Sequence, residues 1–384
     1  MKIAFDVLPL VSDNMSGIGY CEAGFVSEMT KAHPEDQFYF DYFSRKNHEV
    51  KRARLSRYKR ENCTLNESHF SGFVYRMIMN IIPVPYSMFF GKKADVTHFF
   101  NYIIPPFVKG VKIVTIHDMV VRAYPETVRW RTKQLLNTGM KKSMRRADII
   151  ITDSEFSKKE IQKYYPAYAD KVKVVYCGVN LRKFHPVDDL NQIDKVKESL
   201  GINGDYFLYL GTIEPRKNLE RLIEAYKCLC DSDSNAPSLV MAGGKGWLNS
   251  SIYEKVNSLS LSDRVIFTKY VPDEDLCPLI NGATAFVFPS IYEGFGMPPL
   301  EAMACGVPVV ASGEASLPEV VADSAVIVDA YSPQSIAQGM KKVYTDKKFA
   351  LELREKGLRR AAEFTWERFS AQLYDIYKTA AERS

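Results

Sequence analysis

The chain has 384 residues, of which 46% are hydrophobic and 25% are charged. These values are ordinary for globular proteins and exclude a disordered, collagen-like or disulfide-dense chain, and the length suggests two domains. The net charge of +5 hides an asymmetry: residues 1–186 carry 30 basic against 18 acidic side chains (+12), and the remainder carry 21 against 28 (−7). The first half therefore attracts anions.

Short apolar runs alternate with amphipathic helical stretches, which predicts parallel sheets covered by helices on both faces. The first expected strands span residues 2–10, 37–43, 112–119, 148–152 and 172–176. A linker is expected between residues 178 and 200, where Gly178, Pro186 and a polar run interrupt the pattern. Further strands are expected over residues 206–210, 239–242, 265–270, 285–288, 307–311 and 325–328, and a last helix over residues 366–377.

No segment of the sequence is apolar for long enough to cross a bilayer. Asp6 breaks the apolar start, so we expect no signal peptide, and the seven cysteines form no C-x-x-C pair. We therefore expect a cytoplasmic protein with reduced thiols. Residues 45–60 hold eight basic side chains near the apolar segment 73–90. This arrangement suggests contact with an anionic membrane or nucleic acid, or else a solvated basic face beside a buried core helix.

Two motifs each follow an expected strand and precede an expected helix. Residues 211–218 read GTIEPRKN, and residues 289–301 read PSIYEGFGMPPLE. The carboxyl edge of a parallel sheet is where ligands bind, and Arg216 and Lys217 are suited to phosphate. The alternative for this pair is a solvated basic turn. In the second motif, the glycines allow close approach of the backbone to a ligand, and Glu293 and Glu301 flank the loop.

The Glu-x7-Glu spacing, with Gly-Phe-Gly-Met-Pro inside and Pro-Arg-Lys-Asn upstream, resembles the retaining glycosyltransferases of family 4. The resemblance covers essentially the whole chain and is strongest over residues 206–329. It implies an α/β protein of the GT-B class, with two facing Rossmann-like domains. These would span residues 1–186, which would bind the acceptor, and 187–364, which would bind the donor, with a C-terminal helix (365–384) crossing back to the first. Within the family, the chain most resembles bacterial mannosyltransferases that build O-antigen or capsular polysaccharide.

The resemblance also assigns roles to residues. Arg216 and Lys217 would stabilise the leaving diphosphate, Glu293 would contact the transferred sugar, and Glu301 would bind the ribose. His117 matches a histidine near that sugar, although a lone histidine at a strand end is more often structural. The remaining donor-binding residues would be Gly17, Gly19, Gly243, Gly244, Tyr270, Val271, Gly294, Phe295, Gly296 and Met297; for the Gly17–Gly19 and Gly243–Gly244 loops the alternative is a plain turn.

Because two side-chain cations would face the leaving group, the resemblance implies no metal and no cofactor. The co-substrate would be a nucleotide diphosphate sugar, with GDP-mannose as the best candidate. The acceptor would be a glycan or a polyprenyl-diphosphate-linked glycan. Peripheral contact with an anionic membrane is a further expectation, and nucleic acid is not an expected partner. The alternatives are a non-catalytic nucleotide-sugar-binding GT-B subunit and a sugar-nucleotide epimerase.

Overall fold

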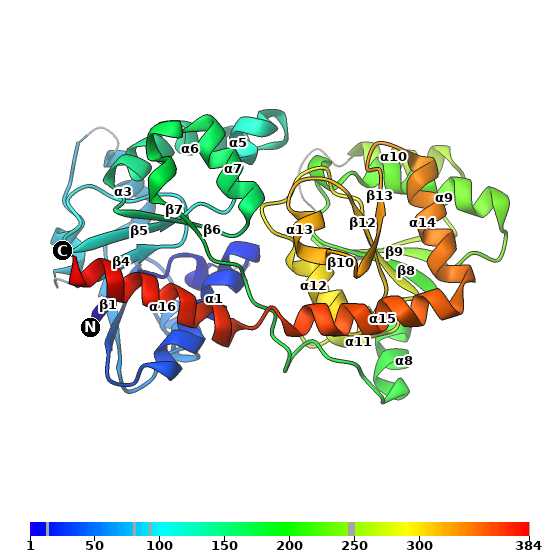
Figure 1. The fold of residues 1–384 in the computed structure, drawn as a ribbon, viewed down its shortest axis with the longest axis horizontal. Helices are drawn as coiled ribbons and strands as arrows, with labels where there is room; N and C mark the ends of the chain where they lie inside the picture. Colours follow the sequence, from blue (N-terminus) through cyan, green and yellow to red (C-terminus); the bar gives the residue numbers. More distant parts are fainter. Residues whose placement is uncertain (13–14, 80–81, 92–93, 245–249, 384) are drawn as a thin grey trace. The chain divides into compact units, whose positions relative to one another are not determined.

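The computed structural model describes the chain except for residues 13–14, 80–81, 92–93, 245–249 and 384 and the side chains of Phe73 and Ser250. The chain forms two compact units (Figure 1), unit 1 with Met1–Gly178 and Trp366–Ser384, and unit 2 with Val179–Thr365. The sequence placed the boundary eight residues later, after Pro186. Residues 179–187 belong to unit 2 because Val179 donates a backbone hydrogen bond to Phe364 and Val187 donates one to the Asn281 side chain.

Unit 1 is built on a seven-stranded parallel sheet of order β3-β2-β1-β4-β5-β6-β7. Its strands are β1 (Lys2–Asp6), β2 (Gln37–Phe43), β3 (Cys63–Ser68), β4 (Val96–Phe99), β5 (Val111–Thr115), β6 (Ile149–Thr152) and β7 (Val172–Val174). Its α-helices are α1 (Gly17–Ala32), α2 (His48–Ser56), α3 (Gly72–Ile78), α4 (Ser87–Phe90), α5 (Val120–Ala123), α6 (Trp130–Arg146), α7 (Glu155–Tyr164) and α16 (Trp366–Glu382). Short 3-10 turns cover Pro9–Val11, Pro125–Thr127 and Pro166–Lys171.

Unit 2 is built on a six-stranded parallel sheet of order β10-β9-β8-β11-β12-β13. Its strands are β8 (Tyr206–Leu210), β9 (Ser238–Ala242), β10 (Val265–Lys269), β11 (Ala285–Phe288), β12 (Val309–Ser312) and β13 (Ala325–Val328). Its helices are α8 (Leu190–Ser199), α9 (Leu219–Ser232), α10 (Ser250–Ser258), α11 (Leu276–Asn281), α12 (Met297–Ala304), α13 (Leu317–Val321), α14 (Pro333–Thr345) and α15 (Lys347–Ala362), with a 3-10 turn at Pro215–Lys217.

The two sheets share one topology. In each, the first strand of the unit lies in the middle and the order reverses beside it, between β1 and β4 in unit 1 and between β8 and β11 in unit 2. Loops that leave the two strands at such a reversal diverge and leave a crevice at the carboxyl edge, where ligands of open α/β sheets bind. The topology thus marks one expected ligand position in each unit.

The C-terminal helix α16 packs on α1 of unit 1 (Figure 1). Trp366 meets the ring of Phe25 edge-on, with centroids 5.1 Å apart, and a Cβ at Gly24 would lie only 2.2 Å from the indole. Phe369, Leu373 and Tyr377 are buried on the same helix. Unit 1 therefore takes part of its core from the last residues of the chain.

Residues 73–90 do not form one helix. They contain the short helices α3 and α4, and their buried side chains Tyr75, Met79, Tyr86 and Phe90 belong to the core. Met77 and Met88 are exposed by 58% and 70% on the same segment. Among the described residues, no helix has the length and apolar character to cross a bilayer.

Candidate active site

Four charged side chains meet in unit 2 at the carboxyl edge, beside the reversal between β8 and β11. Arg216 Nε lies 2.7 Å from Glu214, and Arg216 Nη1 lies 2.9 Å from Oε2 of Glu293. Lys217 Nζ lies 2.6 Å from Oε1 of the same Glu293. The two cations and two carboxylates balance, and three of the four are buried, with Arg216 the most accessible. We call Glu214, Arg216, Lys217 and Glu293 the charge cluster.

The electrostatics of the charge cluster keep Glu293 ionised. Burial alone would raise the pKa of its carboxyl, but the charges of Arg216 and Lys217 outweigh burial and lower that pKa to about 2. Burial and the neighbouring Arg216 lower the pKa of the Lys217 ammonium, and Glu293 and Glu214 oppose this. A ligand that enters the cluster therefore meets an ionised carboxylate held between two cations.

Backbone geometry fixes the cluster in place. Asn218 has a left-handed conformation (φ 62°) directly before α9, and its side-chain amide donates to the carbonyls of Pro289 (3.0 Å) and Ala330 (2.6 Å). Arg216 also donates to the carbonyl of Tyr292 at 3.0 Å. The bonds to Pro289 and Tyr292 join the loop after β8 to the loop after β11, and the bond to Ala330 joins it to the segment after β13.

The glycine loop after β11 ends at α12. Gly296 precedes that helix with φ 132°, a conformation that favours glycine, and a Cβ there would lie 2.9 Å from Leu317. The Ser316 hydroxyl lies 3.0 Å from the carbonyl oxygen of Glu293 and 2.5 Å from that of Phe295. Gly294 and Phe295 therefore belong to a loop whose path is fixed at both ends, and Met297 is the first residue of α12.

Glu301 lies in the second turn of α12. Burial raises the pKa of its carboxyl to about 7, and the charge of Lys183 opposes this rise. Lys183 itself forms an ion pair of 2.7 Å with Asp273. Nearby in sequence, Val271 is buried and Tyr270 is 69% exposed.

The loops after β8 and β9 touch through their backbones. Gly243 has φ 142°, and a Cβ at that position would lie 2.0 Å from the carbonyl oxygen of Gly211. Among the described residues, no atom lies within 4 Å of a Cβ built at Gly244. The following residues of this predicted motif, Lys245, Gly246 and Trp247, lie outside the described residues.

The remaining predicted residues, Gly17, Gly19 and His117, lie in unit 1. Gly17 is the first residue of α1. Gly19 is buried, and a Cβ added there would lie 2.5 Å from the side chain of Met15. Both ring nitrogens of His117 are engaged, Nδ1 with Asp153 Oδ2 at 2.5 Å and Nε2 with the Phe100 carbonyl at 2.7 Å. Burial disfavours the protonated ring and lowers the pKa of His117. The charge of Asp153 and the two hydrogen bonds have the opposite effect and outweigh burial, so the pKa is raised. To donate a hydrogen bond to a sugar, the ring of His117 would have to give up one of these two bonds. The sugar role of His117 stays a prediction.

Comparison with known proteins identifies the family. The model of glycosyltransferase family 4 matches residues 43–183, and that of glycosyl transferases group 1 matches residues 192–360. O-antigen chain mannosyltransferase B of Escherichia coli is 33% identical over 288 residues, which is 74% of this chain and 74% of that relative. The chain belongs to glycosyltransferase family 4. This confirms the resemblance read from the two motifs.

Other family 4 similarities differ in extent. The serotype-specific mannosyltransferase WbdA of Escherichia coli is 34% identical over 224 residues, 58% of this chain but only 27% of that protein. HepE from Anabaena, solved in complex with UDP and glucose, superposes with a TM-score of 0.74 at 16% identity, over 99% of this chain and all of that one. The latter likeness shows the fold, and the predicted GT-B class of two Rossmann-like domains is confirmed.

Proposed function

We propose that this family 4 glycosyltransferase transfers mannose from GDP-mannose to a growing glycan of a cell-surface polysaccharide, with retention of the anomeric configuration. The mannosyl assignment is supported by the name of the Escherichia coli relative that is 33% identical. The observation that carries the chemistry is the buried charge cluster at the strand-order reversal of unit 2.

In this proposal the charge cluster serves the leaving group and the sugar at once. When the bond between the anomeric carbon and the diphosphate breaks, negative charge develops on the phosphate, and Arg216 and Lys217 stabilise it. Glu293 then accepts hydrogen bonds from sugar hydroxyls and faces the positive charge of the oxocarbenium-like centre. Glu214, which holds Arg216 at 2.7 Å, keeps that guanidinium oriented when the donor draws Glu293 towards the sugar. The two cations take the place of a divalent metal.

The surrounding loops complete the donor site in the same proposal. Backbone amides of Gly294 to Met297 and the N-terminus of α12 contact the donor, and Glu301 binds the ribose hydroxyls. Gly243, Gly244, Tyr270 and Val271 line the nucleotide. Gly17, Gly19 and His117 lie in unit 1, and their expected donor roles stay predictions.

The acceptor side is proposed from the charge of the first half of the chain. Eight basic residues lie within residues 45–60, and Arg45, Lys46 and Arg52 are among the exposed ones. Such a surface suits the diphosphate of a polyprenyl-linked acceptor at the cytoplasmic face of a membrane, with the exposed Met77 and Met88 on the same unit. Flotation with anionic vesicles that weakens as salt rises supports this part; equal binding to neutral vesicles contradicts it.

The donor and the reaction are tested by one panel. The full chain is incubated with a polyprenyl-diphosphate-linked glycan and GDP-mannose, UDP-glucose or ADP-glucose, and the released nucleotide and the product linkage are measured. Transfer from GDP-mannose with an α-configured product is expected. Transfer from a UDP-sugar and not from GDP-mannose would show that the proposed donor is wrong. Donor binding without transfer favours the non-catalytic subunit, and conversion of the free nucleotide sugar favours the epimerase.

A further inference from the structure

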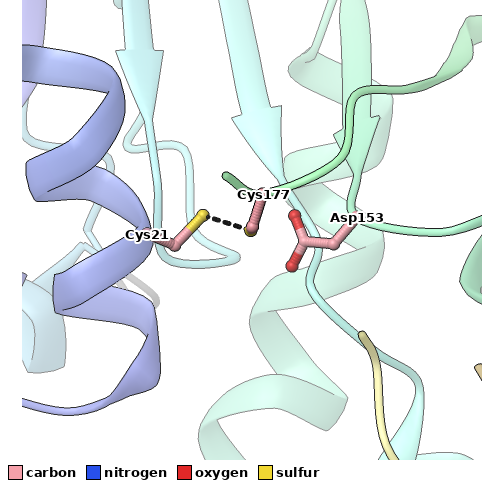
Figure 2. Close-up of side chains that lie close together, drawn as sticks. All are labelled: Cys21, Asp153 and Cys177. Atoms are coloured by element: carbon pink, nitrogen blue, oxygen red, sulfur yellow. Dashed lines mark hydrogen bonds between the residues drawn. The ribbon is translucent and has the colours of Figure 1, made fainter. Parts of the chain in front are cut away.

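Two buried cysteines of unit 1 meet beside a buried carboxylate. Cys21 lies in the second turn of α1, Asp153 follows β6, and Cys177 follows β7 (Figure 2). The two Sγ atoms are 2.8 Å apart, and the two residues are only 2% and 1% exposed. This contact is shorter than ordinary packing of two sulfur atoms allows, so the thiols are poised for a chemical interaction.

Asp153 supplies a proton acceptor at the same place. Its Oδ2 is held by His117, and its Oδ1 is buried with no hydrogen-bond partner among the described residues. One carboxylate oxygen and the two sulfurs lie within 4.8 Å of one another, and Figure 2 shows the carboxylate turned towards Cys177. A buried polar atom without a partner is costly, so this oxygen needs an explanation.

Two chemistries suit this set of donors, a bound soft metal ion and a disulfide, and the sulfur separation distinguishes them. Two thiolates on a tetrahedral zinc, each about 2.3 Å from the metal, lie about 3.8 Å apart. A metal would therefore force these buried sulfurs apart by about 1 Å. A disulfide of about 2.05 Å requires an approach of about 0.75 Å instead. The geometry favours the disulfide.

We propose that Cys21 and Cys177 form a reversible disulfide by exchange with a low-molecular-weight disulfide, and that Asp153 Oδ1 accepts a proton from the attacking thiol. In balance, two protein thiols and one small disulfide give one protein disulfide and two small thiols. The first attack forms a mixed disulfide and releases one small thiol, and the second protein sulfur displaces the other. Each protein thiol gives up one proton, the first of them through Asp153, and the two protons end on the two released small thiols.

The surroundings explain why a base is needed. Burial raises the pKa of both thiols, and the negative charge of Asp153 adds to the effect, so few thiolates exist at neutral pH. A carboxylate that takes the proton as the sulfur attacks removes that obstacle. Both sulfurs are buried, so a reagent reaches them only when the chain around them opens locally.

The bond would tie α1 to the last residues of unit 1. Cys177 directly precedes Gly178, after which the chain enters unit 2. The cross-link closes a loop of more than 150 residues, and closing a long loop restricts the unfolded chain. The oxidised protein should therefore melt at a temperature several degrees above that of the reduced protein.

The test treats the full-length folded protein with oxidised glutathione and maps its cysteines by mass spectrometry without reduction. The expected product is one cross-linked peptide pair, Cys21 with Cys177, reversed by dithiothreitol and accompanied by the rise in melting temperature. Cys228→Ser, a change at a half-exposed thiol of α9, should leave the product unchanged. Asp153→Asn should slow its formation about tenfold or more.

The wild-type map alone decides the matter if a cysteine variant fails to fold. Glutathione attached only to Cys228 or Cys230, with Cys21 and Cys177 still reduced in the folded protein, overturns the proposal. So does uptake of one equivalent of Co²⁺ with a thiolate absorption band, which would assign the three residues to a metal.

Discussion

Glu293 balances both cations of the charge cluster, which makes its replacement informative. Glu293→Gln removes the negative charge but keeps the shape, so Arg216 and Lys217 lose their shared counter-charge and attract a diphosphate more strongly, while Arg216 keeps its ion pair with Glu214. We expect turnover to fall about 10²–10³-fold, because a contact made in the transition state is lost. GDP, measured by titration calorimetry, should bind at least as tightly as it does to the wild type.

A matched control for this change is Glu352→Gln, an exposed carboxylate on α15. It should alter neither turnover nor GDP affinity. Weaker GDP binding by Glu293→Gln would mean that the carboxylate holds the nucleotide rather than the sugar.

Glu301 provides a pH prediction at the same scale. Its pKa is about 7 in the folded protein against an ordinary 4.5, so the folded state holds this proton more tightly. The stabilising contribution of Glu301 is therefore complete below about pH 4.5 and is lost as the pH rises through about 7. Glu301→Gln stays neutral, so its stability relative to the wild type should increase between pH 5 and pH 8. Urea unfolding at both pH values measures this; an equal difference at both would show that Glu301 does not titrate in this range.

Residue types at the site could be predicted from the sequence, but their pairing could not. Arg216, Lys217 and Glu293 were each assigned by motif, whereas their mutual ion pairs depend on β8 lying beside β11, a neighbourhood that alternating strands and helices do not specify. Glu214 stands inside the first motif and received no role, because a carboxylate two residues before an arginine looks like a surface charge. Ser316, 21 residues beyond Phe295, gave no signal at all.

At the scale of elements, the contact between the loops after β8 and β9 gives a matched pair of glycine variants. Gly243→Ala would place its Cβ 2.0 Å from a backbone oxygen at φ 142°, whereas the Cβ of Gly244→Ala would meet no atom of the described residues within 4 Å. We expect the first to destabilise unit 2 by about 1–3 kcal/mol and to weaken GDP binding. Gly244→Ala should keep wild-type stability. Thermal melting measures the stability of both variants. Equal stability of the two would mean that the loops after β8 and β9 can separate without cost.

Helix α16 gives the second prediction for an element. Removal of residues 366–384 uncovers α1 and breaks the contacts of Trp366 with Phe25 and of Tyr377 with His98. Unit 1 should then unfold at a lower temperature and transfer should be lost, although every proposed catalytic residue remains. Removal of residues 379–384 alone keeps those contacts and should have little effect. A chain without α16 that melts like the full chain would contradict this role.

The sequence predicted most strands of both sheets, but it missed β3 and β4. The polar run CTLNES of β3 lacks a strand-like apolar pattern, and the polar residues Thr97 and His98 occupy the middle of β4. The expected strand 2–10 stops at Asp6, because Pro9 begins a 3-10 turn. Strand order was not predictable, since it is set by which crossovers pack best and not by any local pattern.

At the scale of the whole molecule, we propose that the charge asymmetry separates the binding of the two substrates. The excess of +12 in residues 1–186 suits the proposed anionic acceptor, while Arg216 and Lys217 are matched by carboxylates within the charge cluster. We therefore expect the net positive charge of the first half to attract the acceptor from a distance. The donor is expected to be held by short-range contacts with the charge cluster.

The central claim is that the charge cluster moves the sugar without a metal. The decisive measurement is the single-turnover rate of transfer from GDP-mannose in EDTA, for the wild type, Lys217→Met and the exposed control Lys356→Met. The account predicts full rate for the wild type and Lys356→Met, and a loss of about 10²–10³-fold for Lys217→Met that Mn²⁺ does not restore. A wild type that stops in EDTA and recovers with Mn²⁺, or a Lys217→Met variant at full rate, would contradict it.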